Sequence, residues 1–344
     1  METTTRASNI LWIALFRGMG DAVLLYPAVK LCAQRFPDSR IAIALRSAAA
    51  EDVFRAYGFE GPLMRVPRTG PSLAFWFLRA GLKSYEIVFD ASSIQQLHVS
   101  RWAARLLARG ECVGYDYGSS SMLYTKRLST EPLATRHMKD IYAGLLAPFV
   151  SAMSSVELIR PPALPHALDS LPLPHRGKRI VVHPGGRDNI ETFEKRWPAG
   201  KYRRLIAALT ADGTRHVVLV GSRAERAWVQ NKFAGVLGEH AVSVAGLTSV
   251  HQLFELIASA DLFIGNNSGP LHMAAACRVP CLTFAGGIPL QRWGVAAPAP
   301  AVVLGHDKRC PVCTHYACPD HGRPCLEAIT LDETLDAALS LLKG

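Results

Sequence analysis

The sequence has no apolar run that approaches the roughly 20 residues a helix needs to cross a bilayer. The longest candidate, Ile141–Met153, is too short. The start, Met1–Arg6, also lacks the charged segment, apolar stretch and small-residue cleavage site of a secretory signal, since it carries an acid and leads into a strand pattern. We therefore expect a soluble, cytoplasmic protein.

Acidic residues are fewer than basic ones, 28 against 38, which gives a net charge of +10. This excess favours an anionic partner such as a nucleotide, a phosphorylated lipid or a membrane face. The basic residues are scattered and form no tail of the nucleic-acid-binding kind, so we expect no nucleic-acid partner. Arg101, Arg105 and Arg109 fall on one face of a predicted helix, which is either a solvated face or a contact with an acceptor or a membrane.

The length and the alternating pattern predict two α/β domains. A chain of 344 residues, 49% of them apolar, exceeds what one core usually holds. Strand and helix patterns alternate in both halves, which is typical of parallel, doubly wound sheets. We expect Rossmann-like domains at residues 1–160 and 179–344, joined by a proline-rich linker at 161–178 and facing each other across a cleft that binds ligands. The predicted strands are Asn9–Phe16, Arg40–Arg46, Leu63–Pro67, Tyr85–Asp90, Glu111–Tyr115, Arg179–His183, His216–Gly221, Ala241–Ala245, Asp261–Gly265 and Pro280–Ala285.

The most informative stretch is Ile264–His272, where an apolar strand ends in a turn of small residues and a helix begins at once. Such a turn directs backbone N–H groups and the positive end of a helix dipole at one anion, which predicts a phosphate-binding loop. The turn Arg17–Asp21 has a related design. It lacks the third glycine of the dinucleotide-binding fingerprint, and no acid follows the second strand, so that fingerprint is excluded.

Several motifs, taken in order and with their spacing, make the chain resemble the family 9 glycosyltransferases, whose main members are ADP-heptose:lipopolysaccharide heptosyltransferases. The motifs are Arg17–Asp21 with Tyr26–Ala28, His183–Gly185, Lys195–Pro198, Gly221-x-x-x-Glu225, Ala245–Ser249 and Asn267–Ala275. The resemblance spans almost the whole chain. It implies a GT-B fold and metal-independent, inverting transfer of heptose from ADP-heptose to a sugar hydroxyl.

The resemblance implies that Asp21 is the catalytic base. An inverting displacement needs a carboxylate opposite the leaving group to take the acceptor proton. The alternative is that Asp21 only caps a helix and complements its dipole. Arg17, Gly18 and Gly20 form the loop around it on the acceptor side.

The resemblance places the donor site in the second domain. Lys195 matches a family lysine near the phosphates and the transferred sugar, the alternative being a surface lysine. Glu225 matches an acid that holds the ribose diol, the alternative being an exposed glutamate beside a helix start. His272 either contacts phosphate or packs on the preceding strand. The remaining donor-site residues are His183, Gly185, Asn267, Ser268, Gly269 and Pro270.

Two departures from the family pattern bear on the donor. Asn267 stands where the family usually has an aspartate expected to contact hydroxyls of the donor sugar, and an amide keeps hydrogen bonding but loses charge. The stretch Arg187–Glu194 makes the loop before Lys195 longer than in the family. The extra residues either reshape the pocket or form a lid over it. A different nucleotide sugar therefore stays open, and so does a nucleotide-binding module without catalysis.

Four of the eight cysteines gather near the end of the chain: Cys310, Cys313, Cys318 and Cys325. In a cytoplasmic protein such clustering favours reduced thiols or a metal over disulfides. Thiolates suit a structural zinc or iron, and the alternative is a group of free thiols. We expect no metal in catalysis. The other cysteines, Cys32, Cys112, Cys277 and Cys281, are expected in the core.

The first domain is expected to hold the acceptor. An inner-core lipopolysaccharide is anionic and membrane-anchored, although a protein or small-molecule acceptor stays open. The aromatic segment Leu73–Arg79, with Lys83 beyond it, suits contact with the inner face of the membrane. The alternative is that these aromatics fill the core of the domain.

Overall fold

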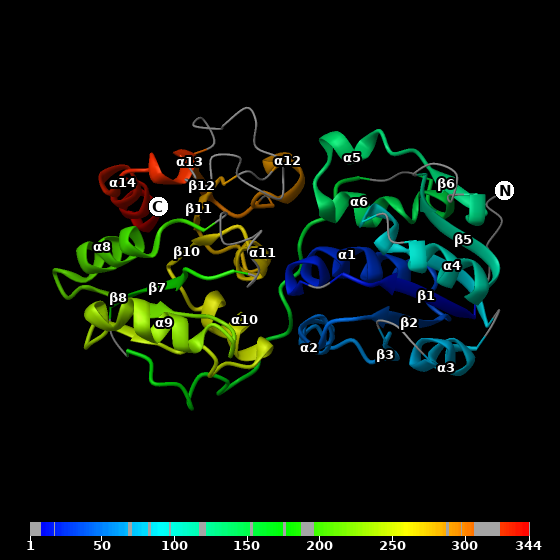
Figure 1. Cartoon of the computed structure of the whole chain (residues 1–344), viewed down its shortest axis with the longest axis horizontal. Helices are drawn as coiled ribbons and strands as arrows, with labels where there is room; N and C mark the ends of the chain where they lie inside the picture. Colours follow the sequence, from blue (N-terminus) through cyan, green and yellow to red (C-terminus); the bar gives the residue numbers. More distant parts are fainter. Residues whose placement is uncertain are drawn as a thin grey trace. The chain divides into compact units, whose positions relative to one another are not determined.

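The structure is a computed structural model, which describes residues 8–16, 18–67, 71–81, 84–95, 98–116, 122–151, 154–174, 177–186, 196–286, 289–296, 298–305 and 324–343. The chain divides into two compact units, Met1–Ile159 and Arg160–Gly344 (Figure 1). Each is described by itself. Within the described ranges, no helix has both the length and the apolar composition that a membrane crossing requires.

The first unit is built on a parallel six-stranded sheet in the order β3-β2-β1-β4-β5-β6. Its strands are β1 (Asn9–Ala14), β2 (Arg40–Leu45), β3 (Leu63–Arg65), β4 (Tyr85–Asp90), β5 (Ala108–Tyr115) and β6 (Lys126–Leu128). Its α-helices are α1 (Met19–Arg35), α2 (Ala48–Ala56), α3 (Pro71–Ala80), α4 (His98–Leu107), α5 (Pro132–Thr135) and α6 (Met138–Gly144).

Helices cover both faces of this sheet, which is why β1 is an unbroken apolar run. Leu11 and Ile13 of β1 belong to the cluster that α3 and α4 complete. Trp12 points to the other face, where it stacks on Phe89 of β4 at a ring-centroid distance of 4.6 Å. Packing on both faces of the sheet therefore holds the strands, and with them their carboxyl ends, in place.

The second unit repeats the plan, with a parallel sheet in the order β12-β11-β10-β7-β8-β9 (Figure 1). Its strands are β7 (Lys178–His183), β8 (Arg215–Leu219), β9 (Ala241–Ser243), β10 (Leu262–Asn266), β11 (Cys281–Phe284) and β12 (Ala301–Leu304). Its α-helices are α8 (Ala199–Thr210), α9 (Arg226–Phe233), α10 (Val250–Ala258), α11 (Gly269–Ala276), α12 (Leu290–Trp293), α13 (Pro324–Glu327) and α14 (Leu331–Lys343). In both sheets the first strand of the unit lies inside the order, so the predicted doubly wound α/β architecture is confirmed.

The proline-rich stretch has no helix or strand between residues 161 and 174 and lies on the surface of the second unit. Side chains of α10 hold its backbone. His251 Nε2 lies 3.0 Å from the Pro162 carbonyl oxygen, and Gln252 Nε2 donates to the Ala167 carbonyl at 2.9 Å. Because its prolines cannot donate, the stretch is fixed by side chains rather than by a backbone ladder.

The prediction that three arginines share one helix face was wrong. Helix α4 ends at Leu107, so Arg109 is a residue of β5 and pairs with Glu86. Arg101 is only 2% exposed, whereas Arg105 lies on the surface. The sequence pattern failed here because no proline or glycine separates this helix from the strand that follows it.

The expectation of core cysteines is confirmed for Cys32, Cys112 and Cys281, which are fully buried. Burial raises the pKa of the Cys32 thiol to about 12, despite a hydrogen bond with Trp12. Cys277 is partly exposed. The buried thiols behave as small apolar groups rather than as reactive ones.

Candidate functional site

Three of the predicted donor-site side chains meet at the carboxyl edge of the second sheet. His183 ends β7, Glu225 immediately precedes α9, and Ser268 immediately precedes α11. His183 Nδ1 lies 2.9 Å from the Ser268 hydroxyl, and His183 Nε2 lies 3.7 Å from Glu225 Oε1. The imidazole thus joins two segments that are 43 residues apart in the sequence.

Glu225 is held from several sides. Its Oε1 accepts from the Gly186 N–H and its Oε2 from the Ser222 N–H, both at 2.7 Å. Burial acts to raise the pKa of this carboxyl, but the hydrogen bond and charge of His183 and the hydrogen bonds of Ser222 outweigh it and hold the pKa well below its usual value. The residue is 7% exposed, so the alternative of an exposed glutamate is wrong.

Gly185 allows the backbone to pass directly over this carboxylate. A Cβ atom at residue 185 would lie 2.0 Å from Glu225 Oε1 and 2.8 Å from its Cδ, closer than any real contact. The glycine of the His183–Gly185 motif is therefore required by close approach, because any side chain would displace the carboxylate.

The turn into α11 keeps the design of an anion site. Ser268 is the N-cap residue, yet its side chain makes no cap hydrogen bond; the hydroxyl contacts His183 and donates to the Asn266 carbonyl at 3.1 Å. Gly269 and Pro270 form the first turn. The Ser268 side chain consequently leaves the positive end of this helix to another acceptor. His272 is 4% exposed within α11, as its packing alternative expects.

Asn266 supports this edge, and the sequence reasoning missed it. Its Oδ1 accepts from the Trp197 N–H at 2.9 Å, while its Nδ2 donates to the carbonyls of Pro184 and Gly185 at 2.9 and 3.0 Å. It is 3% exposed. A single amide therefore fixes both the turn after β7 and the start of the Trp197 segment. An amide at the end of an otherwise apolar strand was the available signal.

Asn267 also uses its amide within the protein. Its Nδ2 donates to the Trp293 carbonyl at the end of α12. An aspartate could not make this bond, because a carboxylate has no donor. The asparagine that stands here in place of the family's aspartate therefore makes a hydrogen bond within the protein, to the Trp293 carbonyl.

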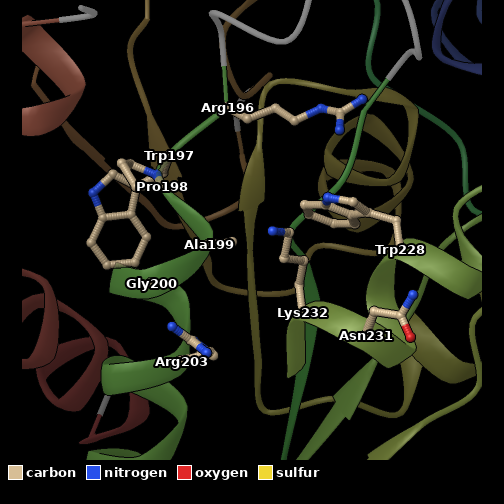
Figure 2. Close-up of a pocket in the computed structure, with 9 residues that line it drawn as sticks. All are labelled: Arg196, Trp197, Pro198, Ala199, Gly200, Arg203, Trp228, Asn231 and Lys232. Atoms are coloured by element: carbon tan, nitrogen blue, oxygen red, sulfur yellow. The ribbon is translucent and has the colours of Figure 1, made fainter. Parts of the chain in front are cut away.

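A basic groove lies between α8 and α9 (Figure 2). It has a volume of about 410 Å³, and its lining residues are Arg196, Trp197, Pro198, Ala199, Gly200, Arg203, Trp228, Asn231 and Lys232. Three of these are cations and none is an acid. Figure 2 shows the Arg196 guanidinium beside the Trp228 ring, with 5.4 Å between its Cζ and the ring centroid. Arg196 also donates to the Gly186 carbonyl at 2.7 Å, which links the groove to the loop on Glu225.

In the first unit, Asp21 lies in the first turn of α1, which follows the carboxyl end of β1. The N-cap residue is Gly18, and Gly20 is buried. The Tyr142 hydroxyl, from α6, donates to Asp21 Oδ1 at 3.1 Å. Tyr142 is fully buried and was not singled out from the sequence. Its contact orients the carboxylate, while Asp21 remains half-buried.

Several predicted residues lie outside the described residues: Arg17, Lys195, Cys310, Cys313 and Cys318, together with the loop Arg187–Glu194. Cys325 is buried in α13. Within the described ranges, no group of three or more His, Cys, Asp or Glu side chains is placed to hold a metal ion.

Comparisons with known proteins agree with this architecture. Residues 78–322 match the family model described as glycosyltransferase family 9 (heptosyltransferase). A lipooligosaccharide heptosyltransferase 2 of Campylobacter jejuni is 26% identical over 172 residues, which are 49% of this chain and 52% of that protein. A lipopolysaccharide heptosyltransferase 3 of Escherichia coli is 23% identical over 286 residues, covering 78% and 80%. The chain spans about half the length of the Campylobacter relatives that it matches.

The fold is that of a solved relative. The structure of E. coli ADP-heptose lps heptosyltransferase II superimposes with a TM-score of 0.75 at 18% identity, covering 97% of this chain and 98% of that one. The GT-B architecture predicted from the sequence is thereby confirmed. Since the family model also covers most of the chain, this protein belongs to glycosyltransferase family 9 (heptosyltransferase).

Proposed function

We propose that this protein is an inverting glycosyltransferase that moves heptose from ADP-heptose to a hydroxyl of a lipopolysaccharide inner-core acceptor. The family assignment supports the reaction class, and the solved E. coli relative is named for ADP-heptose. The observation that carries the proposal is the cluster of His183, Glu225 and Ser268, in which an ionised carboxylate and a helix start lie at one sheet edge.

The donor's two polar parts fit the two sides of this cluster. In the proposal, the ribose hydroxyls donate to Glu225, whose oxygens keep acceptor capacity beyond their two backbone partners. The diphosphate accepts from the first turn of α11 at Ser268 and Gly269, where the dipole favours negative charge. Lys195 takes the role that the family resemblance gives it, beside the phosphates.

The transfer step replaces one bond at the anomeric carbon by another and moves one proton. The acceptor hydroxyl oxygen attacks the anomeric carbon of heptose, the bond from that carbon to the ADP oxygen breaks, and ADP leaves with the electron pair. Asp21 takes the acceptor proton, and fixed donors meet the charge that grows on the leaving diphosphate. Tyr142 positions the base through its hydrogen bond to Oδ1.

The direct test is incubation of the purified protein with ADP-heptose and a panel of heptose-deficient lipopolysaccharide cores. ADP release is measured together with the mass of the acceptor, and a gain of one heptose is expected. Binding of ADP-heptose without modification of any core would reject the proposed acceptor. Absence of binding would reject the proposed donor.

The role of Asp21 is tested by Asp21→Asn, which keeps the shape of the side chain but cannot take a proton. We expect transfer to fall by at least about 100-fold, the scale of general-base catalysis, while the affinity for ADP is unchanged. The matched control is Asp38→Asn, which changes an exposed acid of the same unit. Activity of Asp21→Asn close to that of the control would remove Asp21 from the mechanism.

Asn267 supports a second candidate, transfer from a different nucleotide sugar. One Nδ2 hydrogen is engaged with the Trp293 carbonyl, which leaves the second N–H and the amide oxygen for a donor sugar, and neither group carries a full charge. A panel of ADP-, GDP- and UDP-linked sugars tests this candidate. Turnover of any of them at a higher kcat/KM than ADP-heptose would establish it.

We also propose a structural zinc or iron at Cys310, Cys313, Cys318 and Cys325. Four thiolates form a donor set that tetrahedral zinc and iron accept. The metal would stabilise the end of the chain and takes no part in transfer. Because a lipopolysaccharide acceptor is anchored by its lipid part, the proposal further includes contact of the enzyme with a membrane surface.

A further inference from the structure

The outer faces of α3 and α4 are apolar where surface helices are normally polar. In α3 the solvent side carries Phe75 and Leu78, which are 65% and 70% exposed. In α4 it carries Val99, Trp102 and Leu106, and Trp102 is 57% exposed. The residues recur at helical spacings of three and four, so each helix presents them on one face.

Exposed apolar side chains are concentrated on these two helices. In the described part of the chain, eight large hydrophobic side chains are exposed, and five of them lie on these two helices. The helices pack on each other and on the same cluster of the first sheet (Figure 1). We call the five residues, together with Arg79 and Arg105, the α3–α4 face.

The inner faces of the two helices are complete without these residues. Trp76 and Ala80 of α3 and Ala103, Ala104 and Leu107 of α4 are buried against the sheet. The aromatic segment Leu73–Arg79 therefore divides: Trp76 fills the core, as one alternative expected, and Phe75 points to solvent. The exposed apolar groups need another partner.

The charged side chains of α3 and α4 are all basic. Residues 61–110 contain seven Lys or Arg side chains and two acids, and among the seven Arg101 is buried and Arg65 pairs with Glu51. The two acids are Glu86, which pairs with Arg109, and Asp90, which is fully buried. Helices α3 and α4 contain no acid at all, and Arg79 and Arg105 are exposed on them.

We propose that the α3–α4 face docks on a bilayer surface that carries anionic lipid headgroups. Tryptophan and phenylalanine insert at the boundary between headgroups and acyl chains, and the arginines contact the lipid phosphates. A second copy of this chain is a poorer occupant, because a twofold interface would gather Arg79 and Arg105 of both copies in one desolvated contact to which α3 and α4 bring no acid. The inference rests on the proposed function in one respect, because the lipid-anchored acceptor is the reason for the enzyme to bind a membrane.

The test is co-sedimentation of the full chain with vesicles of phosphatidylcholine, alone or with a quarter of phosphatidylglycerol. The double variant Phe75→Ser/Trp102→Ser is expected to lower the partition coefficient on anionic vesicles at least tenfold. Arg79→Glu/Arg105→Glu is expected to abolish the preference for anionic over neutral vesicles. Met122→Ser, which removes an exposed apolar residue outside the face, is the matched control and keeps wild-type binding.

Two further measurements keep the result interpretable. Melting temperatures show that each variant is folded, and transfer to a deacylated, water-soluble acceptor is expected to be unchanged in all of them. Vesicle binding requires neither the sugar donor nor the transfer reaction, so this assay tests the docking proposal independently of the proposed function. Equal vesicle binding by all variants would overturn the proposal. So would failure of the wild type to bind, or a dimer that the double variant dissociates.

Discussion

Gly185→Ala tests the site through a single methyl group. The added Cβ would lie 2.0 Å from Glu225 Oε1 and 3.4 Å from His183 Nε2, so the carboxylate must move. Because Oε1 accepts from the N–H of the very next residue, Gly186, movement away from the methyl group breaks that bond. The substitution therefore displaces Glu225 while leaving its charge in place.

The size of the effect follows from the bond that is lost. A hydrogen bond from a backbone N–H to an ionised carboxylate contributes about 1.5–3 kcal/mol, and we expect a loss of about 2 kcal/mol of stability after relaxation. For a unit of this size that corresponds to a fall in Tm of about 4–8 °C. If Glu225 also holds the ribose, ADP affinity falls about tenfold, the equivalent of one 1.4 kcal/mol contact.

Gly221→Ala is the matched control. It adds the same methyl group on the other side of Glu225, where the nearest atoms, the Cβ atoms of Ala245 and Glu225, lie at an ordinary 3.4 Å. Calorimetry gives the Tm of both variants, and titration with ADP gives the affinity. Equal Tm values and equal ADP affinities for the two variants would refute the reasoning, because the carboxylate would not then be held where the structure has it.

Three further predictions concern other residues. Burial raises the pKa of Asp90 to about 6, although hydrogen bonds from Tyr124 and Ser100 act to lower it. The Asp90 carboxylate therefore binds a proton more tightly in the folded protein than in the unfolded chain. Its contribution to stability, about 3 kcal/mol, is fully present below about pH 4 and is lost as the pH rises to about 6. Asp90→Asn should flatten the Tm profile over this range, and parallel profiles would contradict the assignment. Asn267→Asp should cost about 1–3 kcal/mol by removing the donor to Trp293 and should speed hydrogen exchange at residues 289–296; exchange like that of the wild type would contradict it. Metal analysis should find about one zinc or iron per chain, and less than about a tenth of an equivalent would mean that the cysteine site is empty.

Most of the fold could be predicted because buried parallel strands are apolar throughout. Tyr85–Asp90 was predicted with its observed bounds, and the other nine predicted strands were each found with at least one end shifted. The strands that were missed, β6 and β12, are edge strands with one neighbour each. Edge strands are short and half-exposed, so β6, with the sequence Lys-Arg-Leu, carries little apolar signal.

The site was predictable where chemistry depends on residue type and spacing. His183, Glu225 and Ser268 were each named from motifs, and the structure brings them together. Asn266 and Tyr142 were missed because their roles arise from contacts between distant segments. Tyr142 reaches Asp21 across 121 residues, a pairing that no local pattern encodes.

The order of strands also has a consequence for how the chain is made. In the first sheet β1 pairs with β2 and β4, and β4 starts roughly 75 residues after β1. A ribosome adds about 5–20 residues per second, so one edge of β1 stays open for roughly 4–15 seconds during synthesis. An open apolar strand edge pairs readily with other chains. Aggregation therefore competes with folding until Tyr85 has left the ribosome. A chain whose synthesis stops before that point keeps the open edge of β1 and has the greatest need of a chaperone.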